Sequence, residues 1–217
     1  MQFQSTVNVW DPLVRIFHWS LALFFITSYL SGEEETWIHP WSGYVIVVLL
    51  LVRLVWGVVG SKHARFADFI YSPAEMLAYA KGLLSGDAKR YLGHNPLGGL
   101  MIIVMMVSLA LTTITGMMLY GVEEGKGPLA GVMAQQSAVQ MPQIISSAHA
   151  DDDEYEFEGH EDEDEENEFL EEIHEFFANF TLLLVFIHLA GVFGESLFHK
   201  ESLLRSMWTG KKRAQHP

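Results

Sequence analysis

The sequence predicts an all-α integral membrane protein, a bundle of four transmembrane helices. Half of its 217 residues are hydrophobic, and they run in long blocks rather than in the periodic pattern of a water-soluble amphipathic helix. A helix that spans a bilayer needs about 20 apolar residues, and four blocks come near or reach that length, at 13–31, 39–60, 97–120 and 173–198. The remaining chain is too short to bury four such helices in water, which favours a membrane setting.

The four blocks differ in the polar residues that they carry. The first lacks a basic leader and an A-x-A cleavage site, so we expect a retained helix rather than a signal peptide. The second contains Arg53, and the third contains no charged residue. Before the third block, Ser72-Pro73-Ala74-Glu75 matches a capping box, which predicts a short amphipathic helix along the membrane surface.

Basic residues are concentrated in two of the connecting segments. They are Lys62, Arg65, Lys81, Lys89 and Arg90 after the second block, and Lys200, Arg205, Lys211, Lys212 and Arg213 after the fourth. The positive-inside rule then places both termini in the cytoplasm of a multi-pass protein of the bacterial inner membrane. The expected organisation is helices one to three in 1–120 with a cytoplasmic loop at 61–96, a periplasmic loop at 121–171, and helix four with a basic tail in 172–217.

The acidity of the chain lies almost entirely in the expected periplasmic loop. Fifteen of the 27 acidic residues fall between Asp151 and Glu172, and the other 12 acids nearly balance 13 basic residues. The run has no helical periodicity, so we expect it to be disordered in part, as far as Phe169. Such a run would attract a cationic partner; a solvated spacer or a loose reservoir for cations is the alternative.

Histidines in three of the blocks are the candidate metal ligands. The chain has no cysteine, which excludes thiolate metal sites, iron–sulfur clusters and covalently attached haem. A histidine inside a membrane is costly and is by default functional, although a single one can simply bond a neighbouring helix. In the predicted topology, His39 and His174 lie near the periplasmic face, and His18 and His188 near the cytoplasmic face.

The spacing of the two histidines in the fourth block predicts two separate sites. His174 and His188 are 14 residues apart, which is close to four helical turns and about 21 Å, so both lie on one face of the helix. Ligands of one zinc ion must converge on a point, which that distance forbids. Two bis-histidine b-type haems fit, in the pairs His39/His174 and His18/His188, enclosed by the four-helix bundle.

Two arginines are candidates for binding the haem propionates. Arg53 is 14 residues after His39, and Arg15 is one turn before His18. A buried arginine needs an anionic partner; for Arg53 the alternative is a side chain that extends to the membrane surface. Glycines one turn from ligands, Gly43, Gly191 and Gly194, either admit a flat ring or serve ordinary helix packing.

The sequence resembles the bacterial four-helix di-haem cytochromes b of the b561 type, which include the cytochrome subunits of nickel–iron hydrogenases and formate dehydrogenases. The resemblance rests on VWDPLVRIFHW, IHPWSGYVIVVLLLVRLVWG and IHEFFANFTLLLVFIHLAGVF, which cover helices one, two and four. It implies an electron-transfer subunit between the membrane quinone pool and a periplasmic redox partner, a cationic c-type cytochrome or a dehydrogenase or hydrogenase subunit. The GHNPLGG stretch resembles the family's quinone element, which suggests Asn95 and Gly98, with His94 as a further candidate; the alternative is that His94-Asn95-Pro96 only caps helix three.

Other functions remain as alternatives. A stand-alone superoxide:quinone oxidoreductase is the enzyme class to consider, but it calls for a cationic funnel rather than an acidic loop. A histidine-based metal transporter or structural anchor would contain no haem. The expected partners are therefore the lipid bilayer, a quinone and a periplasmic electron-transfer protein, and not nucleic acid.

Overall fold

The computed structural model describes residues 5–33, 36–133 and 159–214, and of 159–166 only the course of the backbone. The elements in chain order are β1 (Thr6–Asn8), α1 (Pro12–Leu30), α2 (Ile38–Val59), η1 (Lys62–Ala64), η2 (Phe66–Asp68), α3 (Pro73–Ser85), α4 (Pro96–Glu123), α6 (Gly159–Phe198), α7 (Leu203–Thr209) and β2 (Lys211–Arg213). Four of the helices, α1, α2, α4 and α6, are long and apolar enough to cross a membrane.

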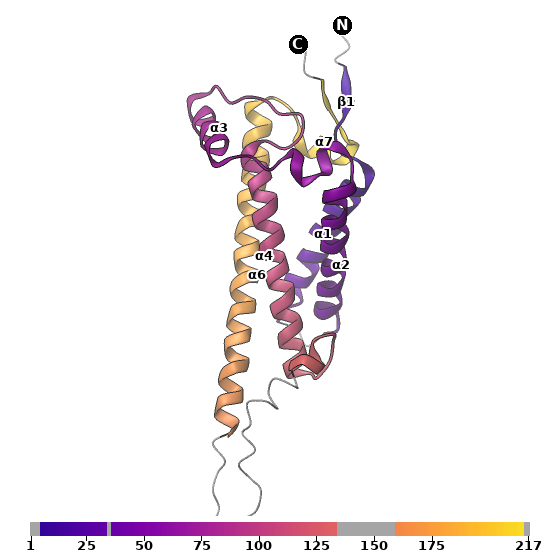
Figure 1. The fold of residues 1–217 in the computed structure, drawn as a ribbon, viewed down its shortest axis with the longest axis vertical. Coiled ribbons are helices and arrows are strands. Elements are labelled where there is room, and N and C mark those ends of the chain that lie inside the picture. The colour runs from indigo at the N-terminus through magenta and orange to yellow at the C-terminus, as the bar shows by residue number, and fades with distance from the viewer. Residues whose placement is uncertain (1–4, 34–35, 134–158, 215–217) are drawn as a thin grey trace, which may run out of the picture.

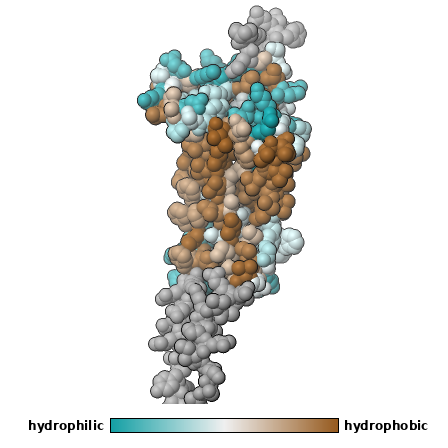
Figure 2. Space-filling view, viewed as in Figure 1, coloured by the Kyte–Doolittle hydropathy of each residue, from teal (hydrophilic) through white to brown (hydrophobic). Residues whose placement is uncertain are grey.

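The predicted bundle of four transmembrane helices is confirmed. Helices α1, α2 and α4 begin and end within three residues of the predicted blocks. On the face shown in Figure 2, hydrophobic residues cover the middle of the molecule and hydrophilic residues gather at one end. Large apolar side chains of the transmembrane helices, such as Val58 on α2 and Phe193 on α6, are 70% and 72% exposed, which a bilayer tolerates and water does not.

The fourth transmembrane helix is longer than the sequence analysis predicted. Helix α6 begins at Gly159 rather than at 173, so the second half of the acidic run is helical and not disordered. Glutamate is a good helix former, and the helix continues outward from the membrane span as far as Gly159. The first part of the run, 151–158, lies outside the described residues.

The helices pack as two pairs. Helix α4 lies along α6, α1 lies along α2, and the pairs meet mainly through α2 and α4 (Figure 1). The small buried core between them contains Phe25, Ile46, Leu50 and Leu109. Midway along the α4–α6 contact, the hydroxyls of Ser108 and Thr181 are 2.7 Å apart and fully buried.

Both termini lie at one end of the bundle, which we call the terminal face (Figure 1). There β1 and β2 pair antiparallel, with Val7 opposite Lys212. Helix α3 carries the predicted capping box, in which Ser72 and Glu75 cap each other's backbone N–H groups, so that prediction is confirmed. The carboxylate of Glu201 accepts hydrogen bonds from the Arg90 guanidinium at 2.9–3.1 Å and from the Arg213 N–H at 2.8 Å, and thereby ties the tail to the loop before α4.

Candidate functional site

The four intramembrane histidines lie in two pairs, as the sequence predicted. The rings of His39 on α2 and His174 on α6 have centroids 6.0 Å apart and are nearly perpendicular, at 89°. The rings of His18 on α1 and His188 on α6 have centroids 6.4 Å apart, at 52°. Helix α6 therefore contributes one histidine to each pair, about 21 Å apart along its axis.

The spacing within each pair fits one iron between two imidazoles. With metal–nitrogen bonds of about 2 Å and about 1.1 Å from nitrogen to ring centre, two axial imidazoles have centres about 6.2 Å apart. The observed 6.0 Å and 6.4 Å bracket that value. No group of three or more histidine and acidic side chains converges on one point in the described part of the chain, so a multidentate metal site is not seen there.

The His39–His174 pair is oriented by hydrogen bonds to neighbouring helices. The Nδ1 atom of His39 lies 2.9 Å from the carbonyl oxygen of Ser28, and Nδ1 of His174 lies 2.9 Å from the carbonyl oxygen of Thr112. The Thr115 hydroxyl is also 3.2 Å from the latter nitrogen. Because a carbonyl can only accept, Nδ1 carries the hydrogen and Nε2 has a free lone pair. Metal-bound histidines are held in this way.

Glycine 116 admits the ring of His174 against α4. A Cβ at Gly116 would lie 2.7 Å from Cε1 and 3.1 Å from Nδ1 of His174, closer than van der Waals contact allows. Helix α4 carries no histidine within its span, yet through Thr112, Thr115 and Gly116 it fixes a candidate ligand. The sequence did not predict a role for these three residues, because the only indication of it is an uncharged polar stretch, TT-x-TG, in an otherwise apolar helix.

The His18–His188 pair has a different environment. Nδ1 of His18 is buried and has no hydrogen-bond partner in the described structure, and the ring packs edge-on against Trp19, with centroids 5.1 Å apart. Trp19 in turn contacts Trp208 of α7 at 5.8 Å. The tail after α6 thus packs over this pair.

The glycines near the candidate ligands border open space. At Gly43, Gly191 and Gly194, an added Cβ would have no atom of the described structure within 4 Å. Glycines that serve tight packing look different, since at Gly57 the ring of Phe66 occupies the Cβ position. Gly43, Gly191 and Gly194 therefore do not serve close helix packing in the described structure.

Arg53 is buried at the end of the bundle that carries the termini. Its side chain is 3% exposed, and Nη1 has no partner in the described structure. The guanidinium lies over the Phe66 ring at 4.8 Å. The side chain does not extend to the surface, so the alternative of snorkelling is not what the structure has. A guanidinium buried without a bonded anion calls for an acidic group.

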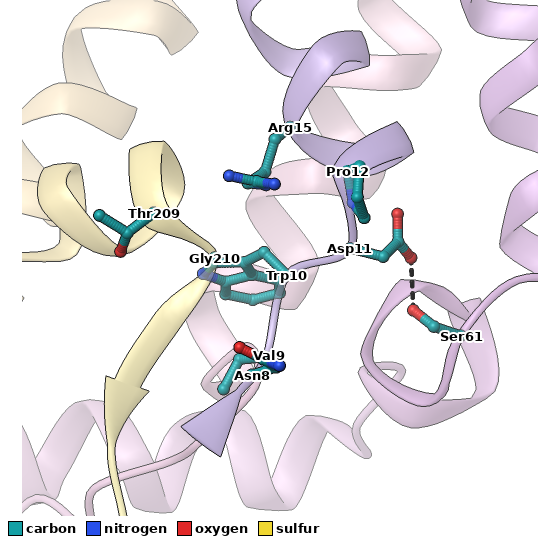
Figure 3. Close-up of a pocket in the computed structure, with 9 residues that line it drawn as sticks. All are labelled: Asn8, Val9, Trp10, Asp11, Pro12, Arg15, Ser61, Thr209 and Gly210. Carbon is teal, nitrogen blue, oxygen red and sulfur yellow. Dashed lines mark hydrogen bonds between the residues drawn. The ribbon is translucent and has the colours of Figure 1, made fainter. Parts of the chain in front are cut away.

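Arg15 lines a pocket at the terminal face, together with Trp10 and Asp11 (Figure 3). Its Nη1 donates to the carbonyl oxygen of Trp208 at 2.7 Å, while its Nε is buried and unpartnered in the described structure. Asp11, the N-cap of α1, accepts hydrogen bonds from Ser61, Val14 and Trp56. Burial raises the pKa of Asp11, but these bonds outweigh it, and the pKa lies below its usual value.

Asn95 caps α4. Its Oδ1 accepts a hydrogen bond from the N–H of Gly98 at 2.7 Å, and Pro96 is the first helical residue. The capping interpretation of Asn95 is therefore confirmed. A quinone site at Asn95 and Gly98 stays a prediction.

Two pairs of imidazoles inside a four-helix membrane bundle are typical of one class of protein, the membrane proteins that bind a metal through histidines of facing helices. Comparison with known proteins agrees with this class. The family model "Prokaryotic cytochrome b561" matches residues 9–210. The chain belongs to that family: it is a multi-pass membrane cytochrome b, and haem b is the cofactor of the family.

Individual relatives carry one description. "Probable Ni/Fe-hydrogenase B-type cytochrome subunit" proteins of Azotobacter vinelandii, Rhizobium leguminosarum bv. viciae and Cupriavidus necator are 29%, 32% and 28% identical to this chain. The matches cover 57%, 57% and 52% of this chain and 62%, 63% and 58% of those proteins. The chain thus spans about three-fifths of the relatives' length. No solved structure matches it.

Proposed function

We propose that this chain binds two haem b groups, one between His39 and His174 and one between His18 and His188. The observation that carries the proposal is the pairing of all four intramembrane histidines at centroid distances of 6.0 Å and 6.4 Å. Arg53 and Arg15, each with a buried unpartnered nitrogen, would hold propionates of the haem at the His18–His188 pair.

The residues around each histidine pair would position the haem and would not themselves take part in a chemical step. Bound haem supplies reversible one-electron chemistry. The carbonyls of Ser28 and Thr112 hold the imidazoles of His39 and His174 with Nε2 free to ligate. Two histidines on one iron leave no open coordination position, which disfavours oxygen or peroxide chemistry.

We further propose that the terminal face lies in the cytoplasm and that the protein resides in the bacterial inner membrane. The loop before α4 and the tail, which carry the basic residues, lie at this face (Figure 1), and the positive-inside rule assigns such a face to the cytoplasm. The acidic residues 151–172 then face the periplasm. The His39–His174 pair is the periplasmic one and the His18–His188 pair the cytoplasmic one.

Electrons would pass between a periplasmic redox partner and membrane quinone. The names of the relatives favour a hydrogenase as the partner. The acidic run would favour a cationic partner surface, such as that of a c-type cytochrome. Quinone exchange would take place near the cytoplasmic pair, at the start of α4 around Asn95 and Gly98.

Haem content and spectra of three variants test the proposal. His174→Ala should lose the periplasmic haem and His188→Ala the cytoplasmic one, so each variant should keep one protohaem per chain in place of two. His199→Ala, which removes a histidine just past the end of α6, is the matched control and should keep both. Two haems in either of the first two variants, or none in the native protein, would refute the assignment.

A further inference from the structure

His94 is a buried imidazole that the haem assignment above does not use. It directly precedes the N-cap of α4 at the terminal face, and its ring packs against two others, Trp10 and Phe69, each with its centroid 4.6 Å away. The Tyr71 hydroxyl donates to the carbonyl oxygen of His94 at 3.0 Å and fixes the backbone. Both the ring and the main chain of His94 are therefore held in place, as a positioning residue requires.

The Nδ1 atom of His94 has no partner. It is buried, and no group of the described structure lies within hydrogen-bond distance. A buried imidazole nitrogen without a partner is costly, so an acceptor or donor absent from the protein is indicated.

The groups around His94 show which kind of partner is missing. Lys212, Arg53, His63 and His188 are close enough to act on its charge, and all four are basic. Burial first, and then these neighbours, lower the pKa of His94 to about 3, so the ring is neutral at physiological pH and keeps one N–H to donate. Arg53 Nη1 and Arg15 Nε are also unpartnered, and an arginine can only donate. Three hydrogen-bond donors without a described acceptor, on His94, Arg53 and Arg15, indicate an anionic acceptor near the His18–His188 pair.

The rings of the His39–His174 pair have no charged hydrogen-bond partner in the described part of the chain. Their Nδ1 atoms donate to the carbonyl oxygens of Ser28 and Thr112, and the hydroxyls of Ser28 and Thr115 lie nearby; none of these groups is charged. The two candidate haems would therefore differ in electrostatic environment. A donor set at the carboxylates of one haem stabilises their negative charge and lowers the repulsion of an added electron.

We propose that His94 is a positioning residue for the haem at the His18–His188 pair: its Nδ1–H donates to a propionate beside Arg53, and this bond raises the reduction potential of that haem. The inference deepens the proposed function, because it requires a haem at this pair. The test is a potentiometric titration of the purified native protein and of His94→Phe, which keeps a ring between Trp10 and Phe69 but has no N–H.

The expected result is a lower reduction potential of the cytoplasmic haem. In His94→Phe, the equilibrium constant for electron transfer from the periplasmic to the cytoplasmic haem should fall by about three- to tenfold, or about 30–60 mV at 59 mV per tenfold for one electron. His94→Gln, with a donor amide, should keep most of the native potential. The control is His63→Phe, which removes a histidine whose Nδ1 is engaged with Asp68 at 2.8 Å and should leave both potentials unchanged.

The other outcomes are equally decisive. An unchanged potential with weaker binding of a quinone analogue would assign the acceptor to quinone and overturn the proposal. An equal shift in His63→Phe would reduce the effect to nonspecific electrostatics and also overturn it. If His94→Phe and His94→Gln both fail to bind the cytoplasmic haem, His94 serves packing alone and the proposal is wrong; if only the phenylalanine variant fails, the donor is required. A native protein without this haem contradicts the proposed function itself.

Discussion

A substitution at Gly116 tests the structure directly, because one added methyl group would clash with His174, a candidate ligand. In Gly116→Ala the new Cβ would lie 2.7 Å from Cε1 of His174, whereas ordinary carbon contacts are about 3.5–4.0 Å. The ring or the helix must therefore move by about 1 Å. Metal–ligand distances tolerate only about 0.2 Å, so the imidazole cannot keep both its place and its bond to iron.

The cost follows from two terms. Overpacking at a close contact costs about 1–3 kcal/mol, and a shifted ring also weakens the bond from Nδ1 of His174 to the Thr112 carbonyl, which contributes about 1 kcal/mol. Together, about 2–4 kcal/mol corresponds to a fall of about 30- to 1,000-fold in haem affinity at the His39–His174 pair. The haem at the other pair should be unaffected.

The assay is the rate of haem transfer from the purified protein to an apo-globin acceptor, resolved by the distinct spectra of the two haems. Gly131→Ala, where an added Cβ has no described atom within 4 Å, is the control and should match the native protein. If Gly116→Ala retains both haems with native transfer rates and spectra, the close approach of His174 to α4 is not as described. Loss of the other haem instead would show that the pairs have been assigned to the wrong helices.

Two further predictions concern the terminal face. Asn95→Ala removes the cap of α4 and should lower stability by about 1 kcal/mol, or about 2–4 °C in the unfolding temperature, with both haem spectra unchanged and Asn95→Ser near native; an unchanged temperature would contradict the cap. Glu201→Gln removes the negative charge and one of the two acceptor oxygens that serve Arg90 and the Arg213 N–H. Burial raises the pKa of Glu201, but those bonds outweigh it and the pKa is lowered, so its stabilisation is present above the unfolded pKa and is lost as pH falls through the folded one. The native protein should be about 1–3 kcal/mol more stable than Glu201→Gln at pH 7. The difference should shrink as the pH falls below the usual glutamate pKa of about 4.3 and vanish only below the lowered folded pKa; a gap that does not depend on pH would contradict this interpretation.

The sequence predicted what depends on local pattern and helix geometry. Apolar blocks placed three of the helices to within three residues, and the 14-residue spacing in α6 predicted the pairing of His18 with His188 and of His39 with His174. The start of α6 was wrong, because a run of acids was taken as a sign of disorder although glutamate supports a helix.

What the sequence did not reveal depends on contacts between distant segments. Thr112 and Gly116, which contact the ring of His174, lie about 60 positions from it in the sequence. Likewise, the burial of Lys212 follows from the pairing of β1 with β2, which links the two ends of the chain. No periodicity or motif within either segment announces such a pairing.

The two histidine pairs are kept in register by the same contact between α4 and α6. Thr181 lies seven residues from both His174 and His188, on the same face of α6, because seven residues are close to two helical turns. Its hydroxyl is fully buried and bonded to that of Ser108 at 2.7 Å. If α6 slid or turned against α4, it would leave two buried hydroxyls unpaired, at about 1–3 kcal/mol each. This contact therefore fixes α6 against α4 at Thr181. Because α6 is one continuous helix, the same contact fixes the positions of His174 and His188, one on either side of it.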